Sequence, residues 1–176
     1  LVDHLRISWV RGDVAGSIEL TPSGPAASAD IPVDRGNLVY RAAELAIDAY
    51  PGTLPTGHLR IELHKRIPSR AGLGGGSSDA AAALLGVVQL LQQVGDSKGG
   101  MTKAADQAAA LATLGSDCPF FLEAASTGFG KCTGRGEIVE AIHPGEFMGR
   151  SFELVVPGIE CGTSQVFGAL QLPKTP

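Results

Sequence analysis

The chain has 176 residues, 44% of them hydrophobic, with a net charge of −4 and a pI near 5.5. This length suits one domain or two small lobes, and the composition excludes a disordered chain. The acidic balance argues against a nucleic-acid-binding surface. No apolar run approaches the roughly 18–20 residues of a membrane span. The three cysteines and four histidines lack the spacing typical of zinc ligands.

The first half of the chain contains strand-like alternation, one loop-like segment and one amphipathic segment. Apolar and polar residues alternate with a period of two where strands are expected, whereas apolar residues three and four apart predict a helix after Asn37, its N-cap. The predicted order is strand 4–9, strand 17–20, loop 21–36, helix 38–50 and strand 59–64.

The second half is richer in alanine, leucine and glycine. The predicted order is helix 78–93, helix 102–114, strand 118–124, a hairpin over 127–142, strand 152–156 and the start of a helix near 163. The strands occur in groups instead of alternating strictly with helices. We therefore predict an α+β fold with a largely antiparallel or mixed sheet, in preference to a doubly wound parallel sheet.

A glycine-rich segment joins a predicted strand to a predicted helix. Residues 68–79 read Pro-Ser-Arg-Ala-Gly-Leu-Gly-Gly-Gly-Ser-Ser-Asp. Glycines at such a junction let successive backbone N–H groups converge, and the helix N-terminus adds its positive dipole end, so a phosphate is the expected ligand. The alternative is a flexible turn capped by serine.

Other phosphate and nucleophile motifs do not fit this segment. A Walker A loop needs a lysine after the glycines, and none is present. Ser77 stands where the dinucleotide-binding pattern needs its third glycine, and Asp79 stands where a hydrolase elbow needs its last one. We expect Asp79 to serve the helix dipole.

The segment from Pro68 to Ser78 resembles the central phosphate-binding motif of the small-molecule kinases related to galactokinase, homoserine kinase and mevalonate kinase, the GHMP family. Flanking segments around residues 37–43, 114–121 and 133–137 strengthen the resemblance. It implies a two-layer α/β kinase fold with ATP and Mg²⁺ as cofactors. The ATP-binding residues that it implies are Pro68, Ser69, Arg70, Ala71, Gly72, Leu73, Gly74, Gly75, Gly76, Ser77 and Ser78.

The resemblance also assigns roles to single residues. Asp117, on a short loop between Gly115 and Pro119, is the implied catalytic residue, because phosphoryl transfer needs a group that accepts the proton of the attacking hydroxyl. Asn37 and Thr163 are weaker candidates for substrate contact, and helix capping is the alternative for both. No metal ligand is assigned, and Ser78 is the candidate contact for Mg²⁺.

The resemblance implies part of a larger kinase. We expect an incomplete N-terminal ATP-binding domain over residues 1–150 and the beginning of a C-terminal domain over 151–176, without the lysine-bearing first strand and the last lobe. The implied substrate is the small molecule 4-diphosphocytidyl-2-C-methyl-D-erythritol, and the implied location is the cytoplasm or a plastid. The alternatives are a kinase of another small alcohol and a non-catalytic nucleotide-binding module.

Overall fold

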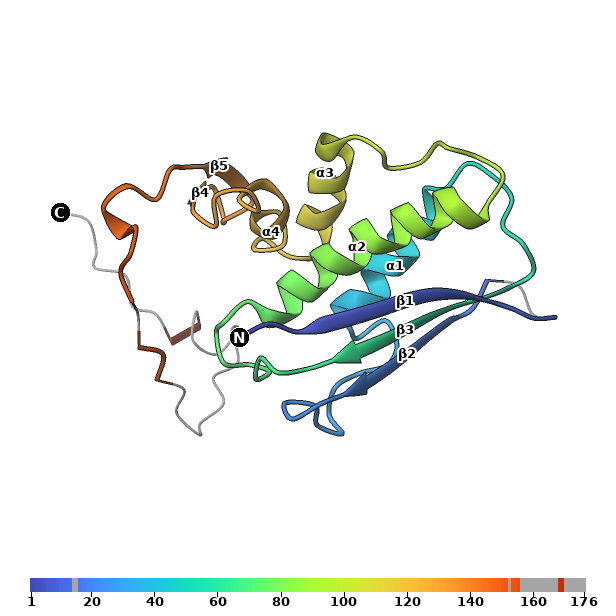
Figure 1. Ribbon diagram of the computed structural model, residues 1–176, viewed down its shortest axis with the longest axis horizontal. Helices are drawn as coiled ribbons and strands as arrows, with labels where there is room; N and C mark the ends of the chain where they lie inside the picture. Colours follow the sequence, from blue (N-terminus) through green and yellow to red (C-terminus); the bar gives the residue numbers. More distant parts are fainter. Residues whose placement is uncertain (14–15, 152, 156–167, 170–176) are drawn as a thin grey trace.

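The structure of the chain is a computed structural model that describes residues 1–13, 16–151, 153–155 and 168–169. A three-stranded sheet carries two helices on one face, and a smaller helical and hairpin region lies beyond them (Figure 1). The elements are β1 (His4–Arg11), β2 (Ile18–Ser23), α1 (Leu38–Asp48), β3 (Gly57–His64), α2 (Gly75–Val94), α3 (Ala104–Leu114), α4 (Phe120–Glu123), β4 (Gly130–Thr133), β5 (Ile138–Ala141) and the 3-10 helix η1 (Gly145–Phe147).

The sheet has the order β1-β3-β2 and is mixed. β1 pairs antiparallel with β3, whereas β2 pairs parallel with β3. The parallel pair follows from the long connection between β2 and β3, which contains α1 and returns the chain to the same end of the sheet. The α+β class is confirmed.

The central strand β3 is the most regular one. Leu59, Ile61 and Leu63 are at most 2% exposed, and they alternate with residues that face away from the helices. The alternation that predicted this strand is therefore the alternation between its two faces.

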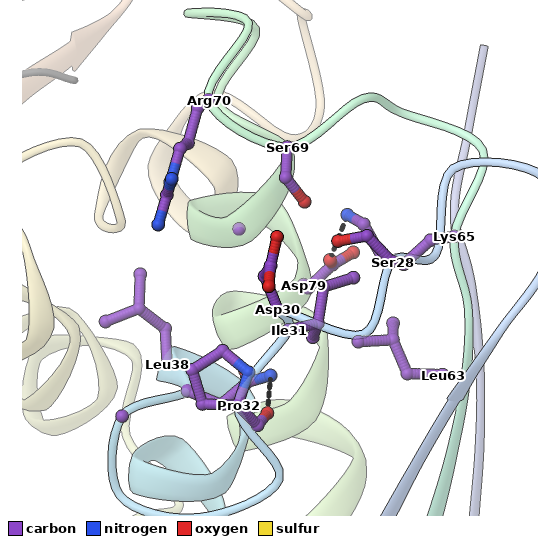
Figure 2. A pocket seen from close by; sticks show the side chains of 13 residues that line it. Ser28, Asp30, Ile31, Pro32, Leu38, Leu63, Lys65, Ser69, Arg70 and Asp79 are labelled. Carbon is purple, nitrogen blue, oxygen red and sulfur yellow. Dashed lines mark hydrogen bonds and ion pairs between the residues drawn. The ribbon is translucent and has the colours of Figure 1, made fainter. Parts of the chain in front are cut away.

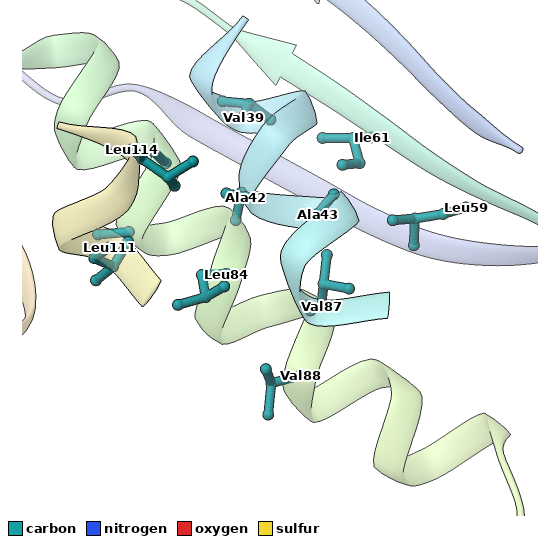
Figure 3. Close-up of a cluster of buried hydrophobic side chains, with 14 of the residues drawn as sticks. Val39, Ala42, Ala43, Leu59, Ile61, Leu84, Val87, Val88, Leu111 and Leu114 are labelled. Carbon is teal, nitrogen blue, oxygen red and sulfur yellow. The ribbon is translucent and has the colours of Figure 1, made fainter. Parts of the chain in front are cut away.

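The core lies between this sheet face and the two helices. Small residues of α1, among them Ala42 and Ala43, pack against Leu84 and Val87 of α2, and all four side chains are fully buried (Figure 3). The helix α1 begins where the sequence predicts, because the Asn37 Oδ1 atom accepts a hydrogen bond from the backbone N–H of Val39 at 2.9 Å. None of the helices in the described ranges combines the length and hydropathy of a membrane span.

The predicted strand over 118–124 is wrong. The chain forms a tight turn and then one helical turn, in which the N–H of Glu123 donates to the carbonyl of Pro119 at 2.9 Å. Proline at a helix start has a φ that already suits the helix, and here φ is −59°. A short apolar run does not distinguish a strand from a buried helical turn.

Other boundaries differ by a few residues. The strand β2 continues to Ser23, into the first residues of the predicted loop, and its Pro22 is accommodated because β2 is an edge strand. The helix α2 begins three residues earlier than predicted, at Gly75. The predicted last strand has Phe152 and Val156 outside the described residues, and residues 153–155 have no regular structure. The predicted helix start near 163 also lies outside them.

We expect Leu84→Ala to lower the free energy of unfolding by about 2–5 kcal/mol, because it leaves a cavity between α1 and α2. Urea unfolding followed by circular dichroism measures the change. Gln89→Ala, at an exposed position of the same helix, is the control and should change stability by less than about 0.5 kcal/mol. Equal effects of the two substitutions would contradict this packing.

Candidate functional site

The glycine-rich segment leads from the end of β3 into α2 with an alternating backbone. Arg70, Gly72 and Gly74 have φ values of 57°, 70° and 67°, whereas the residues between them have no positive φ. Alternation of left-handed and right-handed residues turns neighbouring N–H groups toward the same side of the chain and forms an anion-binding nest. The segment therefore has the alternation of φ that such a nest requires.

The first turn of α2 adds further free backbone N–H groups to those of the loop. The N–H of Ser78 donates to the carbonyl of Gly74 at 2.9 Å, so the N–H groups of residues 75–77 precede the first intrahelical bond. These groups and the positive end of the helix dipole attract anions. The Ser78 hydroxyl donates to the carbonyl of Gly75 at 2.8 Å, which leaves its oxygen lone pairs available to a cation.

A pocket of about 210 Å³ opens beside the segment (Figure 2). Ser69, Arg70 and Gly76 line one side of it, and Asn37 and Leu38, at the start of α1, line another. The remaining lining residues are Ser28, Asp30, Ile31, Pro32, Gly36, Leu63, Lys65 and Asp79. The structure thus brings three of the predicted loop residues and Asn37 to one cavity.

Both polar atoms of the Asn37 side chain are used by the protein. Its Oδ1 atom caps α1, and its Nδ2 group donates to the carbonyl of Pro32 at 2.8 Å. The capping role is therefore observed, and the side chain also fixes the chain before α1 at the rim of the pocket.

A buried ion pair contributes to the lining of the pocket. The Lys65 Nζ atom lies 2.7 Å from Asp79 Oδ2, and it also forms an ion pair with Asp3. These three side chains are 5%, 4% and 2% exposed, respectively. Burial raises the pKa of Asp79 from 3.8 to about 6, although the hydrogen bond with Lys65 opposes this shift.

The pKa of Asp3 shifts in the other direction. Burial of Asp3 raises its pKa, but hydrogen bonds from Lys65 and from the backbone N–H groups of Arg66 and Ile67 outweigh that effect and lower it below 3.8. The cluster therefore holds one ammonium group between two carboxyl groups whose pKa values have moved apart.

Sequence reasoning missed this cluster. Asp79 lies beyond the first turn of α2 and pairs with Lys65, so its assignment to the helix dipole is wrong. The only signal in the sequence was a lysine at the end of an alternating strand, and an exposed lysine gives the same pattern. Asp3 precedes the first strand, and its pairing depends on tertiary structure.

Asp117 lies in the turn between α3 and α4, outside the lining of the pocket. It is exposed, and its Oδ1 atom is 3.4 Å from the Ser116 hydroxyl. The next residue, Cys118, is fully buried; burial raises the pKa of its thiol, and a hydrogen bond with the Ser77 side chain opposes the shift. This contact connects the turn of Asp117 to the first turn of α2. Thr163 lies outside the described residues.

Comparisons with known proteins agree with this geometry. The family model for the N-terminal domain of GHMP kinases matches residues 37–124, which include the glycine-rich segment and Asp117. The 4-diphosphocytidyl-2-C-methyl-D-erythritol kinase of Pelotomaculum thermopropionicum is 41% identical over 168 residues, which are 96% of this chain and 52% of that protein. The chloroplastic kinase of the same name from Mentha piperita is 38% identical, over 82% of this chain and 33% of its own length.

A solved structure is also similar. The crystal structure of a 4-(cytidine 5'-diphospho)-2C-methyl-D-erythritol kinase superposes with a TM-score of 0.52 at 37% sequence identity, covering 80% of this chain and 41% of that one. The chain thus spans about half the length, or less, of the relatives that it matches.

Two glycines of the loop differ in their surroundings and allow a matched test. A Cβ atom at Gly74 would lie 2.9 Å from the Phe121 ring, whereas a Cβ atom at Gly72 would meet nothing within 4 Å. Because both residues are left-handed, we expect Gly72→Ala to cost about 1–2 kcal/mol of stability from backbone strain alone. Gly74→Ala should cost more. Urea unfolding measures both, and equal losses would show that the ring does not constrain the loop.

The pKa of Asp79 predicts a pH-dependent stability. Because the folded carboxyl group holds its proton more tightly than the unfolded one, the stability associated with it is present at about pH 4 and is lost as the pH rises through about 6. Asp79→Asn removes this titration. We therefore expect the free energy of unfolding of the variant, relative to wild type, to increase between about pH 4 and pH 7. Urea titrations at several pH values measure this difference. If the difference between variant and wild type stays constant from about pH 4 to pH 7, the shifted pKa is contradicted.

Proposed function

Because the chain belongs to the GHMP kinase family, we propose that its protein is an ATP-dependent kinase. The proposed reaction transfers a phosphoryl group to the 2-hydroxyl of 4-diphosphocytidyl-2-C-methyl-D-erythritol, in non-mevalonate isoprenoid and terpenoid biosynthesis. The observation that carries the proposal is the glycine-rich nest at the N-terminus of α2, which opens onto the pocket. The names of the relatives support the substrate.

The residues of the loop fit ATP phosphates. The residues from Pro68 to Ser78 offer backbone N–H groups and three serine hydroxyls, and the absence of side chains at the glycines lets the phosphates approach the backbone closely. The adjoining pocket would hold another part of the nucleotide. Mg²⁺ bound to the phosphates would supply charge neutralisation, with the Ser78 oxygen as its proposed protein contact.

Asp117 is the proposed general base. In the reaction the oxygen of the substrate hydroxyl forms a bond to the γ-phosphorus, the bond from that phosphorus to the bridging oxygen breaks, and ADP leaves. The proton of the hydroxyl passes to the Asp117 carboxylate. Its exposure and its connection to the first turn of α2 through Cys118 and Ser77 support this role, because the group that accepts the proton must reach a bound substrate.

Three further assignments stay predictions. Asn37 is proposed to contact substrate or nucleotide from the rim of the pocket, in addition to capping α1. Thr163 is proposed as a second substrate contact. The division into an ATP-binding domain over 1–150 and the beginning of a C-terminal domain over 151–176 is also proposed; the matched family model lies wholly within the first part.

We expect Asp117→Asn to lower kcat by about 10²–10⁴-fold, because the amide cannot accept the proton. Binding of Mg-ATP should be nearly unchanged, since Asp117 does not line the pocket. Phosphorus NMR with Mg-ATP and 4-diphosphocytidyl-2-C-methyl-D-erythritol measures the transfer, and calorimetry measures the binding. The matched control is Asp106→Asn, in the exposed first turn of α3.

The outcomes separate the alternatives. A large loss of Mg-ATP binding in Asp117→Asn would overturn the role of Asp117. Transfer to mevalonate or homoserine, and not to the cytidyl substrate, would indicate a kinase of another small alcohol. Binding of Mg-ATP without transfer to any alcohol would indicate a non-catalytic nucleotide-binding module, and failure of the wild type to bind Mg-ATP would overturn the proposed function.

A further inference from the structure

The buried cluster of Asp3, Lys65 and Asp79 connects three segments that are far apart in the sequence. Asp3 precedes β1, Lys65 follows β3, and Asp79 lies in the second turn of α2. Lys65 donates to both carboxylates, and its bond to Asp79 is 2.7 Å long. The lysine and Asp79 also line the pocket, where Figure 2 shows them joined by a hydrogen bond.

Asp3 holds the beginning of the glycine-rich segment. Its Oδ1 atom accepts hydrogen bonds from the backbone N–H of Arg66 at 2.5 Å and of Ile67 at 2.8 Å. These residues immediately precede Pro68, the first residue of the proposed phosphate-binding segment. One carboxylate therefore fixes the backbone at the loop entrance and, through its other oxygen, the Lys65 ammonium.

The same residues contact the end of the segment. A Cβ atom at Gly75 would lie 2.8 Å from the Ile67 side chain and 3.3 Å from Lys65 Nζ, so the first residue of α2 packs directly on the loop entrance. The bond from Lys65 to Asp79 adds a polar connection one turn further along α2. The two ends of residues 68–74 are consequently held together by a contact and an ion pair.

Stability alone does not account for this arrangement. Two carboxylates and one ammonium carry a net negative charge in a buried site, and buried ion pairs are commonly no more stabilising than apolar residues of similar volume. The other charged groups at the pocket, Asp30 and Arg70, lie on the β2–α1 connection and on the loop itself. Only the cluster connects the two ends of the loop among the ion pairs found in the described residues.

We propose that Asp3, Lys65 and Asp79 are positioning residues that hold the two ends of the glycine-rich segment at the separation its phosphate-binding backbone requires, with Asp3 as the anchor. The effect of these residues on nucleotide binding rests on the proposed function. The order that the cluster imposes on the loop is a property of the protein without nucleotide. The two parts can therefore be tested separately.

The experiment compares Asp3→Ala, Asp3→Asn and Leu91→Ala with the wild type. Leu91 is 1% exposed in the last turns of α2, far along the helix from the loop, so its truncation destabilises the same core without touching the cluster. Amide hydrogen exchange by mass spectrometry, on protein without nucleotide, reports the order of residues 68–78. Calorimetry with Mg-ATP reports binding, at a temperature well below the unfolding midpoints of all variants.

We expect Asp3→Ala to increase exchange in the loop by about tenfold or more and to weaken Mg-ATP binding by a similar factor, since it leaves Lys65 and two backbone donors without a partner they have in the wild type. Asp3→Asn keeps an acceptor for the two backbone donors and should restore part of the protection. Leu91→Ala should leave loop exchange and Mg-ATP affinity unchanged.

The results that overturn the proposal are distinct from those that overturn the proposed function. Equal loop exchange in Asp3→Ala and Leu91→Ala would show that the cluster contributes only to global stability. If Asp3→Ala does not fold, the same comparison between Asp3→Asn and Leu91→Ala decides the question. If hydrogen exchange in the loop depends on Asp3 but the wild type does not bind Mg-ATP, the positioning role is supported and nucleotide binding is rejected.

Discussion

The packing of α2 on the sheet determines where the glycine-rich loop can lie. Leu59, Ile61 and Leu63 of β3 present a fully buried face, which shares one core cluster with alanine, valine and leucine side chains of α1 and α2 (Figure 3). Because the loop has to join the end of this strand to the beginning of this helix, the core determines where the loop lies, and the buried cluster of Asp3, Lys65 and Asp79 holds its two ends together. The short segment between them then adopts left-handed residues to complete the reversal. The exposed N–H groups of the proposed phosphate site are thus a consequence of how the core packs.

The fold was predictable where local pattern and burial agree. The alternation in β3 and the cap at Asn37 depend on neighbours in the sequence, and both are confirmed, whereas α1 ends at Asp48, two residues before its predicted end. The segment 118–124 was predicted wrongly, because its apolar residues are buried or half-buried in a turn and a short helix whose position depends on α2 and the hairpin of β4 and β5. The parallel pairing of β2 depends on the path of a long connection, which local pattern does not record.

The candidate site was also predictable only in part. The glycine-rich segment was recognisable because phosphate binding by backbone N–H groups needs particular residue types in a row. The cluster beneath it was not, since Asp3 and Lys65 are separated by most of the sheet in sequence and meet only after β1 pairs with β3. Burying a lysine between two carboxylates costs desolvation energy. No local pattern in the sequence indicates that these three residues are buried. Burial of these charges is therefore a feature of the site that required the structure.

An uncharged contact between side chains connects Asp117 to the glycine-rich segment. Cys118 is buried beside Ser77, in the first turn of α2, and Asp117 is its covalent neighbour. Since a thiol in such a place is held in its neutral form by burial, it adds no charge between the nest and the carboxylate. The Phe121 ring, which packs on Gly74, supports the same junction from α4. Positioning of Asp117 relative to the loop therefore depends on apolar packing, whereas positioning within the loop depends on the buried charges on its other side.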